Sequence, residues 1–313
     1  MANKFQYGGQ AVIEGVMMRG KNGIAVAVRR PSGQVVVDEQ PLVSWLDKMP
    51  FFKKPFLRGF FALLEALIIG VKALSFSANQ AAEEEEEELS AKEIAITMAV
   101  AFGLAIGLFV VLPTWTAHWL GSSGGEIWKN VLEGIIRIAV FLLYIIIISR
   151  LKDIQRVFQY HGAEHKVIST FERGEELTVE NARKYSTLHP RCGTSFLLIV
   201  MVMSIVVFSV LAFDQIIWRI LSRVLLMPLV AGIAYEIIKF TGKHQDKGWV
   251  KMVSTPGLWL QNLTTREPDD SQVAVAINSL QAVLKQDDSE VEEESPNVNQ
   301  CILEDAVRGE GAC

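Results

Sequence analysis

Two histidines and a glutamate lie close together in the segment Tyr160–His165, which reads Tyr-His-Gly-Ala-Glu-His. On a helix, His161 and His165 are four residues apart, so both imidazoles project from one face and can share a metal ion. Glu164 lies beside them, where its carboxylate could reach a water bound to that ion. This order, H-x-x-E-H, is that of the inverse zincins, in which the metal acidifies a water and the glutamate handles its proton. The motif predicts a zinc site with Glu164 as the catalytic base.

A second pair of possible ligands, His189 and Cys192, follows in the segment His189–Ser195. Either could be a third or fourth ligand, and Glu172 is another candidate. If all four histidine and cysteine side chains bind one ion, the site is closed and structural, because no coordination position remains open. Alternatively, the histidine pair anchors a surface helix to lipid headgroups or caps a neighbouring helix. Cys192, at the start of a predicted helix, could also be a nucleophile or a buried, inert thiol.

The N-terminal segment Gly8–Gly20 contains one acidic residue, Glu14, among apolar neighbours. If residues 10–18 form a single strand, Glu14 lies isolated on one face of that strand. A carboxylate buried in this way needs a cation, so we expect Glu14 to contact Arg19 or the predicted metal. The alternative is an ion pair that fixes this strand to the membrane domain.

The elements that must position these residues belong to a chain of 313 residues, half of them hydrophobic, with a mean hydropathy of +0.28. A helix needs about 20 apolar residues to cross a bilayer core of about 30 Å. Four blocks meet this condition, at residues 94–113, 127–149, 196–213 and 216–240, with a predicted kink at Pro228. The sequence predicts a predominantly α-helical membrane protein with four transmembrane helices. It excludes a simple cytosolic enzyme and, with three scattered cysteines, a disulfide-linked secreted domain.

Charged residues inside the second and fourth blocks form a further candidate site. They include Glu133, Arg137, Arg219 and Arg223. Each charge at such a depth costs about 2.5–3.5 kcal/mol on insertion scales, so we expect these side chains to face the bundle. Glu133 can then pair with Arg137 or Arg223, and the surplus positive charge could receive a phosphate or a lipid headgroup. The alternative is one structural ion pair, with the remaining arginines reaching toward the interface.

Basic residues are distributed unevenly between the connections. Residues 150–195 contain eight Lys or Arg and residues 239–266 contain five, whereas residues 114–126 contain none. Basic connections remain in the cytoplasm, so we predict that both termini are cytoplasmic and, in a bacterium, that the protein lies in the inner membrane. The net charge of −5 comes from the run Glu83–Glu88 and the acidic C-terminal tail. The positive charge lies beside membrane segments, which indicates membrane lipids as partners and not nucleic acid.

Smaller elements are predicted at both ends of the chain. Residues 1–45 are predicted to form a small β-meander, because two β-rich runs, Ile24–Arg30 and Gln34–Val37, flank a Pro-Ser-Gly turn. Residues 241–285 are predicted to be a cytoplasmic helical segment, with one amphipathic helix beginning near Asp269. The acidic tail at 286–313 is predicted to be disordered.

Residues 56–78 are apolar except for Arg58, Glu65 and Lys72, which recur every seven residues. This spacing places the three charges on one narrow stripe of a helix. It predicts an interfacial amphipathic helix on the cytoplasmic surface of the membrane. The alternative is a fifth span.

The three motifs Gly8–Gly20, Tyr160–Lys166 and His189–Phe196 together resemble those of the bacterial YqhQ-like family. That family is a group of multi-pass membrane proteins with a domain of unknown function, catalogued as predicted metal-dependent enzymes. The resemblance covers roughly residues 5–285. It implies a membrane location and a metal site at the H-x-x-E-H motif, and it implies no known substrate.

We therefore expect a metal-dependent membrane enzyme, a zinc hydrolase that cleaves an amide or ester bond at the cytoplasmic membrane surface. One alternative is a non-catalytic membrane scaffold, in which the motifs hold the β-meander and the cytoplasmic helices to the bundle around a structural metal or ion pair. A second alternative is lipid or anion binding or transport through the intramembrane glutamate and arginines.

Overall fold

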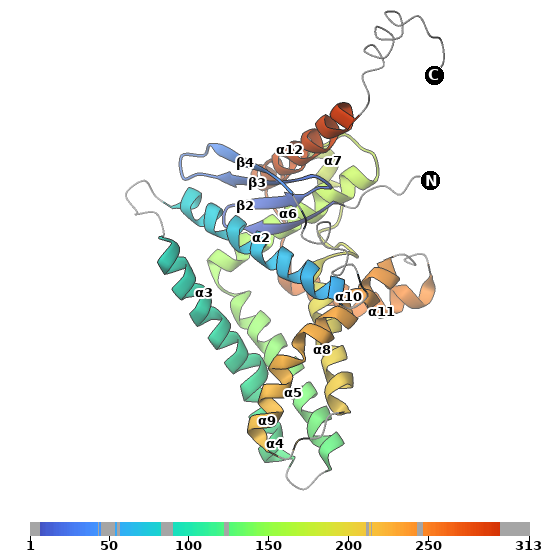
Figure 1. The fold of residues 1–313 in the computed structure, drawn as a ribbon. Helices are drawn as coiled ribbons and strands as arrows, with labels where there is room; N and C mark the ends of the chain where they lie inside the picture. The colour runs from blue at the N-terminus through green and yellow to red at the C-terminus, as the bar shows by residue number, and fades with distance from the viewer. Residues whose placement is uncertain are drawn as a thin grey trace, which may run out of the picture.

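The computed structural model describes residues 7–42, 44, 54, 57–82, 90–121, 125–210, 213, 215–242 and 247–294. Most of these residues are helical, and the strands belong to one small sheet near the N-terminus. Figure 1 shows a head, in which helices surround this sheet, above a stem of long helices. The predicted acidic run at 83–88 and most of the predicted tail, residues 295–313, lie outside the described residues.

The sheet of the head is antiparallel, with strand order β1-β2-β3-β4. The strands are β1 (Gly8–Val12), β2 (Gly15–Arg19), β3 (Gly23–Arg29) and β4 (Val35–Pro41). The two predicted β-rich runs correspond to β3 and β4, and the turn between them contains Gly33 at φ +85°. The prediction of one strand over residues 10–18 is wrong. The chain reverses at Glu14, which has a φ of +52°, so Val12 pairs with Gly15.

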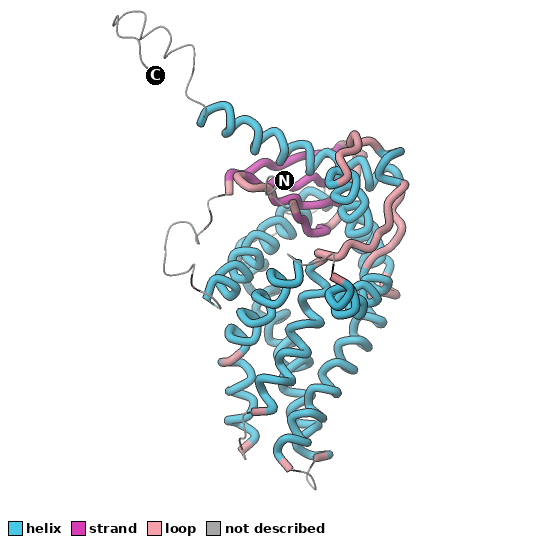
Figure 2. Tube along the Cα trace, turned by 90° about the vertical axis from the view of Figure 1, so that its right-hand side faces the viewer, coloured by secondary structure: helices cyan, strands magenta, loops and turns pink. Residues whose placement is uncertain are grey.

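Helices cover both faces of the sheet, which becomes the middle layer of the head (Figures 1 and 2). On one face, α6 (Lys152–Glu172) and α12 (Asp270–Glu294) pack on a core that includes Val16 and Met18, beside the short helix α7 (Val179–Arg183). On the other face, α2 (Leu57–Ala81) packs on Met17 and Val26. Successive side chains of a strand point to opposite faces, so apolar residues in a row supply both cores.

The charged stripe of α2 faces the protein rather than solvent over much of its length. Glu65 is buried and pairs with Arg19 at 2.9 Å, and Arg58 forms a bidentate pair with Glu236 of α10 (Met227–Gly242). A charge buried in a contact needs a partner of opposite sign. The stripe therefore fixes α2 to the sheet at one point and to the stem at another.

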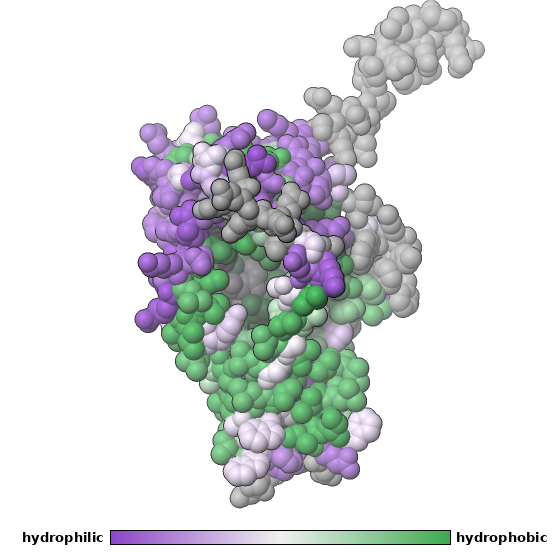
Figure 3. Space-filling view, turned by 90° about the vertical axis from the view of Figure 1, so that its left-hand side faces the viewer, coloured by the Kyte–Doolittle hydropathy of each residue, from purple (hydrophilic) through white to green (hydrophobic). Residues whose placement is uncertain are grey.

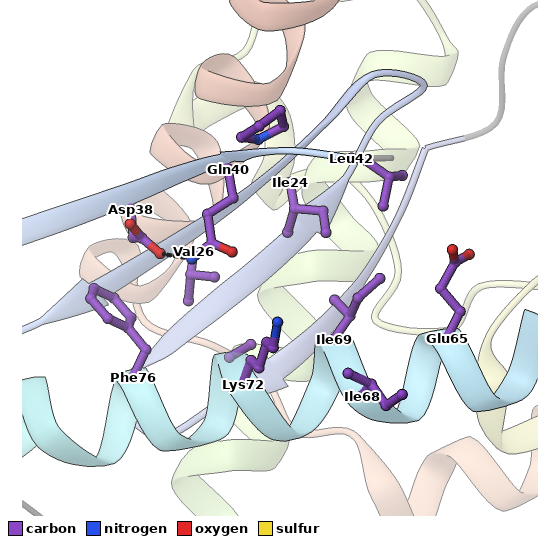
Figure 4. Close-up of a pocket in the computed structure, with 12 residues that line it drawn as sticks. Ile24, Val26, Asp38, Gln40, Leu42, Glu65, Ile68, Ile69, Lys72 and Phe76 are labelled. Carbon is purple, nitrogen blue, oxygen red and sulfur yellow. Dashed lines mark hydrogen bonds between the residues drawn. The ribbon is translucent and has the colours of Figure 1, made fainter. Parts of the chain in front are cut away.

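A cavity of about 170 Å³ remains between α2 and strands β3 and β4. In Figure 4, Lys72 projects from α2 toward the sheet, which carries Asp38 and Gln40. Gln40 donates a 2.7 Å hydrogen bond to Asp38, and the remaining lining is mostly aliphatic and aromatic. This cavity contains none of the predicted site residues.

The stem helices lie close to the predicted apolar blocks. The first is continuous through α3 (Ala91–Ile106), the π-helical turn η2 (Gly107–Val111) and α4 (Leu112–Leu120). The others are α5 (Glu126–Ile148), α8 (Gly193–Ser209) and the pair α9 (Ile216–Leu225) and α10. The last pair is bent by 44° next to Pro228, as predicted. Proline lacks the N–H that would continue the helical hydrogen bonds, so the bend falls there.

Within the described part of the chain, three helices are long and apolar enough to cross a membrane, at Leu57–Ala81, Lys92–Leu120 and Glu126–Ile148, and the bent pair α9–α10 would make a fourth. The apolar helix α8 has 17 residues and is shorter than these. Figure 3 shows hydrophobic residues over the stem and hydrophilic residues over the head. Beyond the stem, α11 (Gly248–Thr264) leads to α12, which extends past the predicted end at Lys285.

Candidate metal site

Helix α6 carries the H-x-x-E-H motif between the sheet and the loop that leads into α8. Tyr160, Ala163 and Val167 on this helix are fully buried in the core shared with the sheet and α12. Their three- and four-residue spacing defines the face of α6 that packs on the sheet. The two histidines are directed toward other chain segments, at residues 187–192 and 264.

Gly162 lets a neighbouring segment approach α6 closely. A Cβ at this position would lie 2.1 Å from the backbone oxygen of Arg266. The Arg266 N–H in turn donates to the backbone oxygen of Phe158 at 2.9 Å. The glycine inside the motif therefore holds the end of α11 against α6, where the carbonyl group of Thr264 meets His161.

Hydrogen bonds to backbone carbonyls orient both histidines of the motif. His161 Nδ1 lies 2.8 Å from the Thr264 oxygen, and His165 Nδ1 lies 2.5 Å from the Thr187 oxygen. A carbonyl only accepts hydrogen bonds, so each Nδ1 carries a proton and Nε2 is the ring nitrogen left to bind a metal. Histidines that bind metals characteristically donate their other N–H to such a group.

The third member of the cluster is Cys192, the N-cap residue of α8. Its Sγ lies 3.2 Å from His161 Nε2, and the ligand atoms of His161, His165 and Cys192 all lie within 4.8 Å of one another. Zinc–nitrogen distances of about 2.0–2.1 Å and a zinc–sulfur distance of about 2.3 Å separate neighbouring ligand atoms of a tetrahedral site by about 3.3–3.6 Å. The cluster is therefore close to the size that one zinc ion requires.

His189 lies beside this cluster but is directed elsewhere. Its ring centroid is 5.6 Å from that of His165, and its Nε2 lies 3.4 Å from a carboxylate oxygen of Glu172. Its Nδ1 accepts the N–H of Arg191, whose side chain also pairs with Glu172. Burial lowers the pKa of His189, so its contact with Glu172 at neutral pH is a hydrogen bond between a neutral ring and a carboxylate. The structure brings together three of the four predicted ligands and directs His189 toward Glu172.

Gln261 of α11 fixes the loop before Cys192, a role that the sequence did not reveal. Its side-chain oxygen accepts the N–H of His189 and its side-chain nitrogen donates to the backbone oxygen of His189, both at 2.9 Å. Gln261 is fully buried. Its partners lie far away in the sequence, so no local sequence motif indicates the contact. The same is true of the Thr187 and Thr264 carbonyl groups, which contact the two histidines of the motif.

Glu164 has a buried carboxyl group, with only 5% of the residue exposed. One oxygen accepts the backbone N–H of Gly9, whereas Oε2 has no hydrogen-bond partner among the described residues. Burial raises the pKa of this carboxyl group, against the opposing influence of His161 and His189. A Cβ at Gly9 would lie 2.6 Å from the Met17 backbone oxygen and 3.1 Å from the Glu164 carboxyl carbon, so glycine is required for this approach.

The site opens into a cavity of about 540 Å³. One part of its wall is formed by Tyr7 and the residues Gly8–Ala11 of β1, and another by the polar side chains of the site. Apolar side chains complete the wall, at Val157, Phe158, Ile168 and Leu197. Its size is within the range of about 300–1,000 Å³ that is usual for ligand pockets.

Glu14 does not contact Arg19, and that prediction is wrong. Its carboxylate forms a bidentate ion pair with Arg156 and accepts the hydroxyl of Tyr160 at 3.3 Å, whereas Arg19 pairs with Glu65. The residue lies in a turn and not in a strand, so its side chain reaches the first half of α6. It fixes the β1–β2 turn to that helix of the head, so it forms an ion pair as in the alternative, but with α6 and not with the helices of the stem.

The charged residues of the stem form a separate buried cluster. Glu133 contacts Arg137 at 2.6 Å and Arg223 at 3.1 Å, so it pairs with both predicted partners. Arg137 also donates to Ser204 and to the backbone oxygen of Phe109. Further contacts involve Asn130 with Arg223, Glu126 with Arg219, and the Phe208 ring, which lies 4.5 Å from the guanidinium carbon of Arg223.

Comparisons with known proteins place these features in a family context. Residues 54–286 match the family model described as a protein of unknown function (DUF1385). The chain is also 36% identical over 308 residues to the "Uncharacterized protein YqhQ" of Bacillus subtilis (strain 168), and the match covers 94% of this chain and 96% of that protein. No solved structure matches the chain. The His161, His165 and Cys192 cluster lies inside the family match.

Proposed function

This chain belongs to the DUF1385 family, and we propose that it is a metal-dependent membrane hydrolase with a zinc site formed by His161, His165 and Cys192. One observation carries the proposal. Two Nε2 lone pairs and one sulfur converge, while both Nδ1 atoms are held by backbone carbonyls. The resemblance to the YqhQ-like family adds the expectation of metal dependence.

The three converging atoms cannot all satisfy one another without a cation. A thiol has one proton and can donate it to only one of the two Nε2 atoms. Burial lowers the pKa of His165 and so favours the neutral ring, which can accept a hydrogen bond at Nε2. The neutral ring is also the form that binds metals. A divalent ion with affinity for nitrogen and sulfur, as zinc has, would satisfy all three atoms at once.

The geometry favours a catalytic site over a closed structural site. Three protein ligands leave the fourth position of a tetrahedral zinc ion for water or substrate, as in catalytic zinc sites. His189, which could have closed the site, is engaged by Glu172. The cavity of about 540 Å³ is lined by all three ligands and by Glu164.

Glu164 is the general base in this proposal. When bound, zinc would acidify a water and polarise a substrate carbonyl. The carboxylate of Glu164 takes a proton from the attacking water through its unpartnered Oε2, while the water oxygen bonds to the carbonyl carbon. The bond from that carbon to the amide nitrogen or ester oxygen breaks, and Glu164 returns the proton to the leaving atom. One water is consumed, and the products are a carboxylic acid and an amine or alcohol.

The proposed location is the inner membrane, with both termini and the head in the cytoplasm. The apolar stem helices α3–α4, α5, α8 and α9–α10 are the four proposed spans, and basic residues gather in the head. Helix α2 passes the length and composition criteria for a span, yet ion pairs join it to β2 and to α10. We therefore place it along the membrane surface. The metal cavity then lies at the boundary between head and stem.

Metal analysis of the full-length protein, purified in detergent from cells grown with zinc, tests the metal site. We expect about one zinc ion per chain. His161→Ala and Cys192→Ser should each lose the ion, whereas His118→Ala, on α4 outside the cluster, should retain it. A folded protein without metal would contradict the proposal.

Catalysis is tested with Glu164→Gln, which keeps the shape of the side chain but cannot take up a proton. This variant should retain zinc and lose hydrolysis of amide and ester substrates that the unmodified protein cleaves, by about 10²–10⁴-fold. Full activity in the variant would contradict the role of Glu164. It would favour the scaffold alternative with a structural metal, under which His161→Ala mainly lowers the melting temperature.

A further inference from the structure

Strand β1 lies at an edge of the sheet, and its outer side faces the metal cavity. Among the described strands it pairs only with β2, and the five consecutive residues Tyr7–Ala11 line the cavity that also contains Glu164 and the three proposed ligands. An edge strand leaves every second residue with its backbone N–H and C=O unpaired.

The N–H groups of Gly9 and Ile13 point away from β2. Gly9 donates to the carboxyl group of Glu164, and Ile13 donates to Ser77 at 3.2 Å. In an antiparallel ladder the direction alternates from one residue to the next, so Ala11, between them, also directs its N–H and C=O outward. No described residue donates to or accepts from these two groups, and Ala11 is only partly buried.

We infer that an extended polypeptide segment docks on the outer side of β1 as an additional strand and is the substrate of the hydrolase. This inference rests on the proposed function. Pairing with Ala11 would hold the backbone of the segment beside Glu164, and the strand is open at Gly8, where no atom lies within 4 Å of an added Cβ. Addition of a strand to a free sheet edge is a common mode of peptide recognition.

The backbone pattern distinguishes a polypeptide from a lipid ester. Ala11 offers one donor and one acceptor on the same side of the strand, and a polypeptide presents the complementary acceptor and donor at one residue. An acyl ester has no N–H to donate. The apolar side chains Phe158 and Leu197 in the same cavity favour an apolar residue near the cleaved bond. Water then adds across the peptide bond and yields a new carboxylate and a new amino group.

The first experiment locates a cleaved peptide and tests how its backbone is held. A mixture of random decapeptides is incubated with the zinc-loaded, full-length protein in detergent, and cleavage is read by mass spectrometry. The preferred peptide is then made with one N-methyl group at each position in turn, and its affinity is measured with the Glu164→Gln variant. We expect a loss of about tenfold at the one position whose N–H donates to Ala11, from one lost hydrogen bond, and smaller losses elsewhere. Equal losses at all positions, or no cleaved peptide, would overturn the inference.

The second experiment removes the outward N–H of the strand. Proline is tolerated on edge strands where its nitrogen faces away from the ladder, so Ala11→Pro should leave the sheet intact. It should weaken peptide binding by about tenfold without loss of zinc, whereas Ala11→Ser, which keeps the N–H, should bind normally. Unchanged binding by a folded Ala11→Pro protein would overturn the inference. If this variant does not fold, the N-methyl series decides.

The two proposals fail in different ways. Zinc-dependent hydrolysis of a small ester, with no peptide bound, would overturn the docking of a polypeptide and leave the hydrolase proposal standing. Absence of zinc and of all hydrolysis would overturn the proposed function. Peptide binding that appears only after removal of residues 1–6 would make the chain's own N-terminal segment the occupant of β1 and overturn the inference.

Discussion

The buried polar cluster of the stem and that of the head differ in how fully their polar atoms are paired. In the stem, the carboxylate of Glu133 contacts two arginines, and all three nitrogens of the Arg137 guanidinium group donate to a described residue. In the head, one oxygen of Glu164 has no partner among the described residues, and two Nε2 lone pairs face a single sulfur.

This difference indicates different roles for the two clusters. Buried polar atoms are normally paired, so an unpaired group in a native structure calls for an explanation. Glu164 and the two histidines of the motif line a cavity of about 540 Å³, which indicates a ligand. In the stem, the pairing of Glu133, Arg137 and Arg223 with one another indicates a structural role. Arg219 is less completely paired, because its Nη1 has no partner among the described residues.

Removal of one carboxylate from each cluster should produce the largest contrast. Glu133→Leu leaves two buried guanidinium groups without their shared partner, and we expect a loss of about 3–5 kcal/mol in the free energy of unfolding. Glu164→Gln removes a carboxylate that has only one hydrogen bond, and we expect a change of less than about 1 kcal/mol in the metal-free protein. Chemical unfolding in detergent measures both.

A matched variant separates charge from shape in the stem. Glu133→Gln keeps a hydrogen-bond acceptor for the arginines but not the charge. Its free energy of unfolding should therefore lie between those of the unmodified protein and of Glu133→Leu. Equal stability of Glu133→Leu and Glu164→Gln would contradict the contrast between the clusters.

Two adjacent glycines provide a smaller and more local test in the head. Gly9→Ala places a methyl group 2.6 Å from the Met17 backbone oxygen and should cost about 1–3 kcal/mol while moving β1 away from Glu164. Gly8→Ala is the control, because no atom lies within 4 Å of its added methyl group. Thermal unfolding and hydrolysis should both be impaired in the first variant and near normal in the second. Equal effects would show that the close approach of β1 to Glu164 is unimportant.

The smallest predicted effect is a dependence of stability on pH that arises in the head. Burial lowers the pKa of His165 and His189 below 6.5, so below that pH the unfolded state binds protons that the folded state does not. The free energy of unfolding of the metal-free protein should therefore fall as the pH falls from 6.5. Glu164 opposes this, because its raised pKa makes the folded state bind a proton before the unfolded state does.

Glu164→Gln removes the opposing contribution, so acidification should destabilise this variant more steeply than the unmodified protein. Unfolding measured at several pH values between about 5 and 8 would show the difference in slope. A variant that becomes more stable on acidification would contradict the assignment of neutral, buried histidines.

Patterns of neighbouring residues were sufficient to predict much of the fold. The apolar blocks predicted the ends of the stem helices to within a few residues in most cases, and the β-rich runs predicted β3 and β4. The four-residue spacing of His161 and His165 placed both on one side of α6, and Pro228 marked the bend. The reversal at Glu14 was missed, because its residue type gives little indication of a positive φ.

The sequence by itself determined which residues could bind a metal, because ligand chemistry and helical spacing are local properties. Only the tertiary structure decided which of them meet: Cys192 joins the histidine pair, His189 turns to Glu172, and Gly9 reaches Glu164. These contacts depend on how β1, α8 and α11 pack around α6, and such packing follows from the burial of whole faces and not from any short motif.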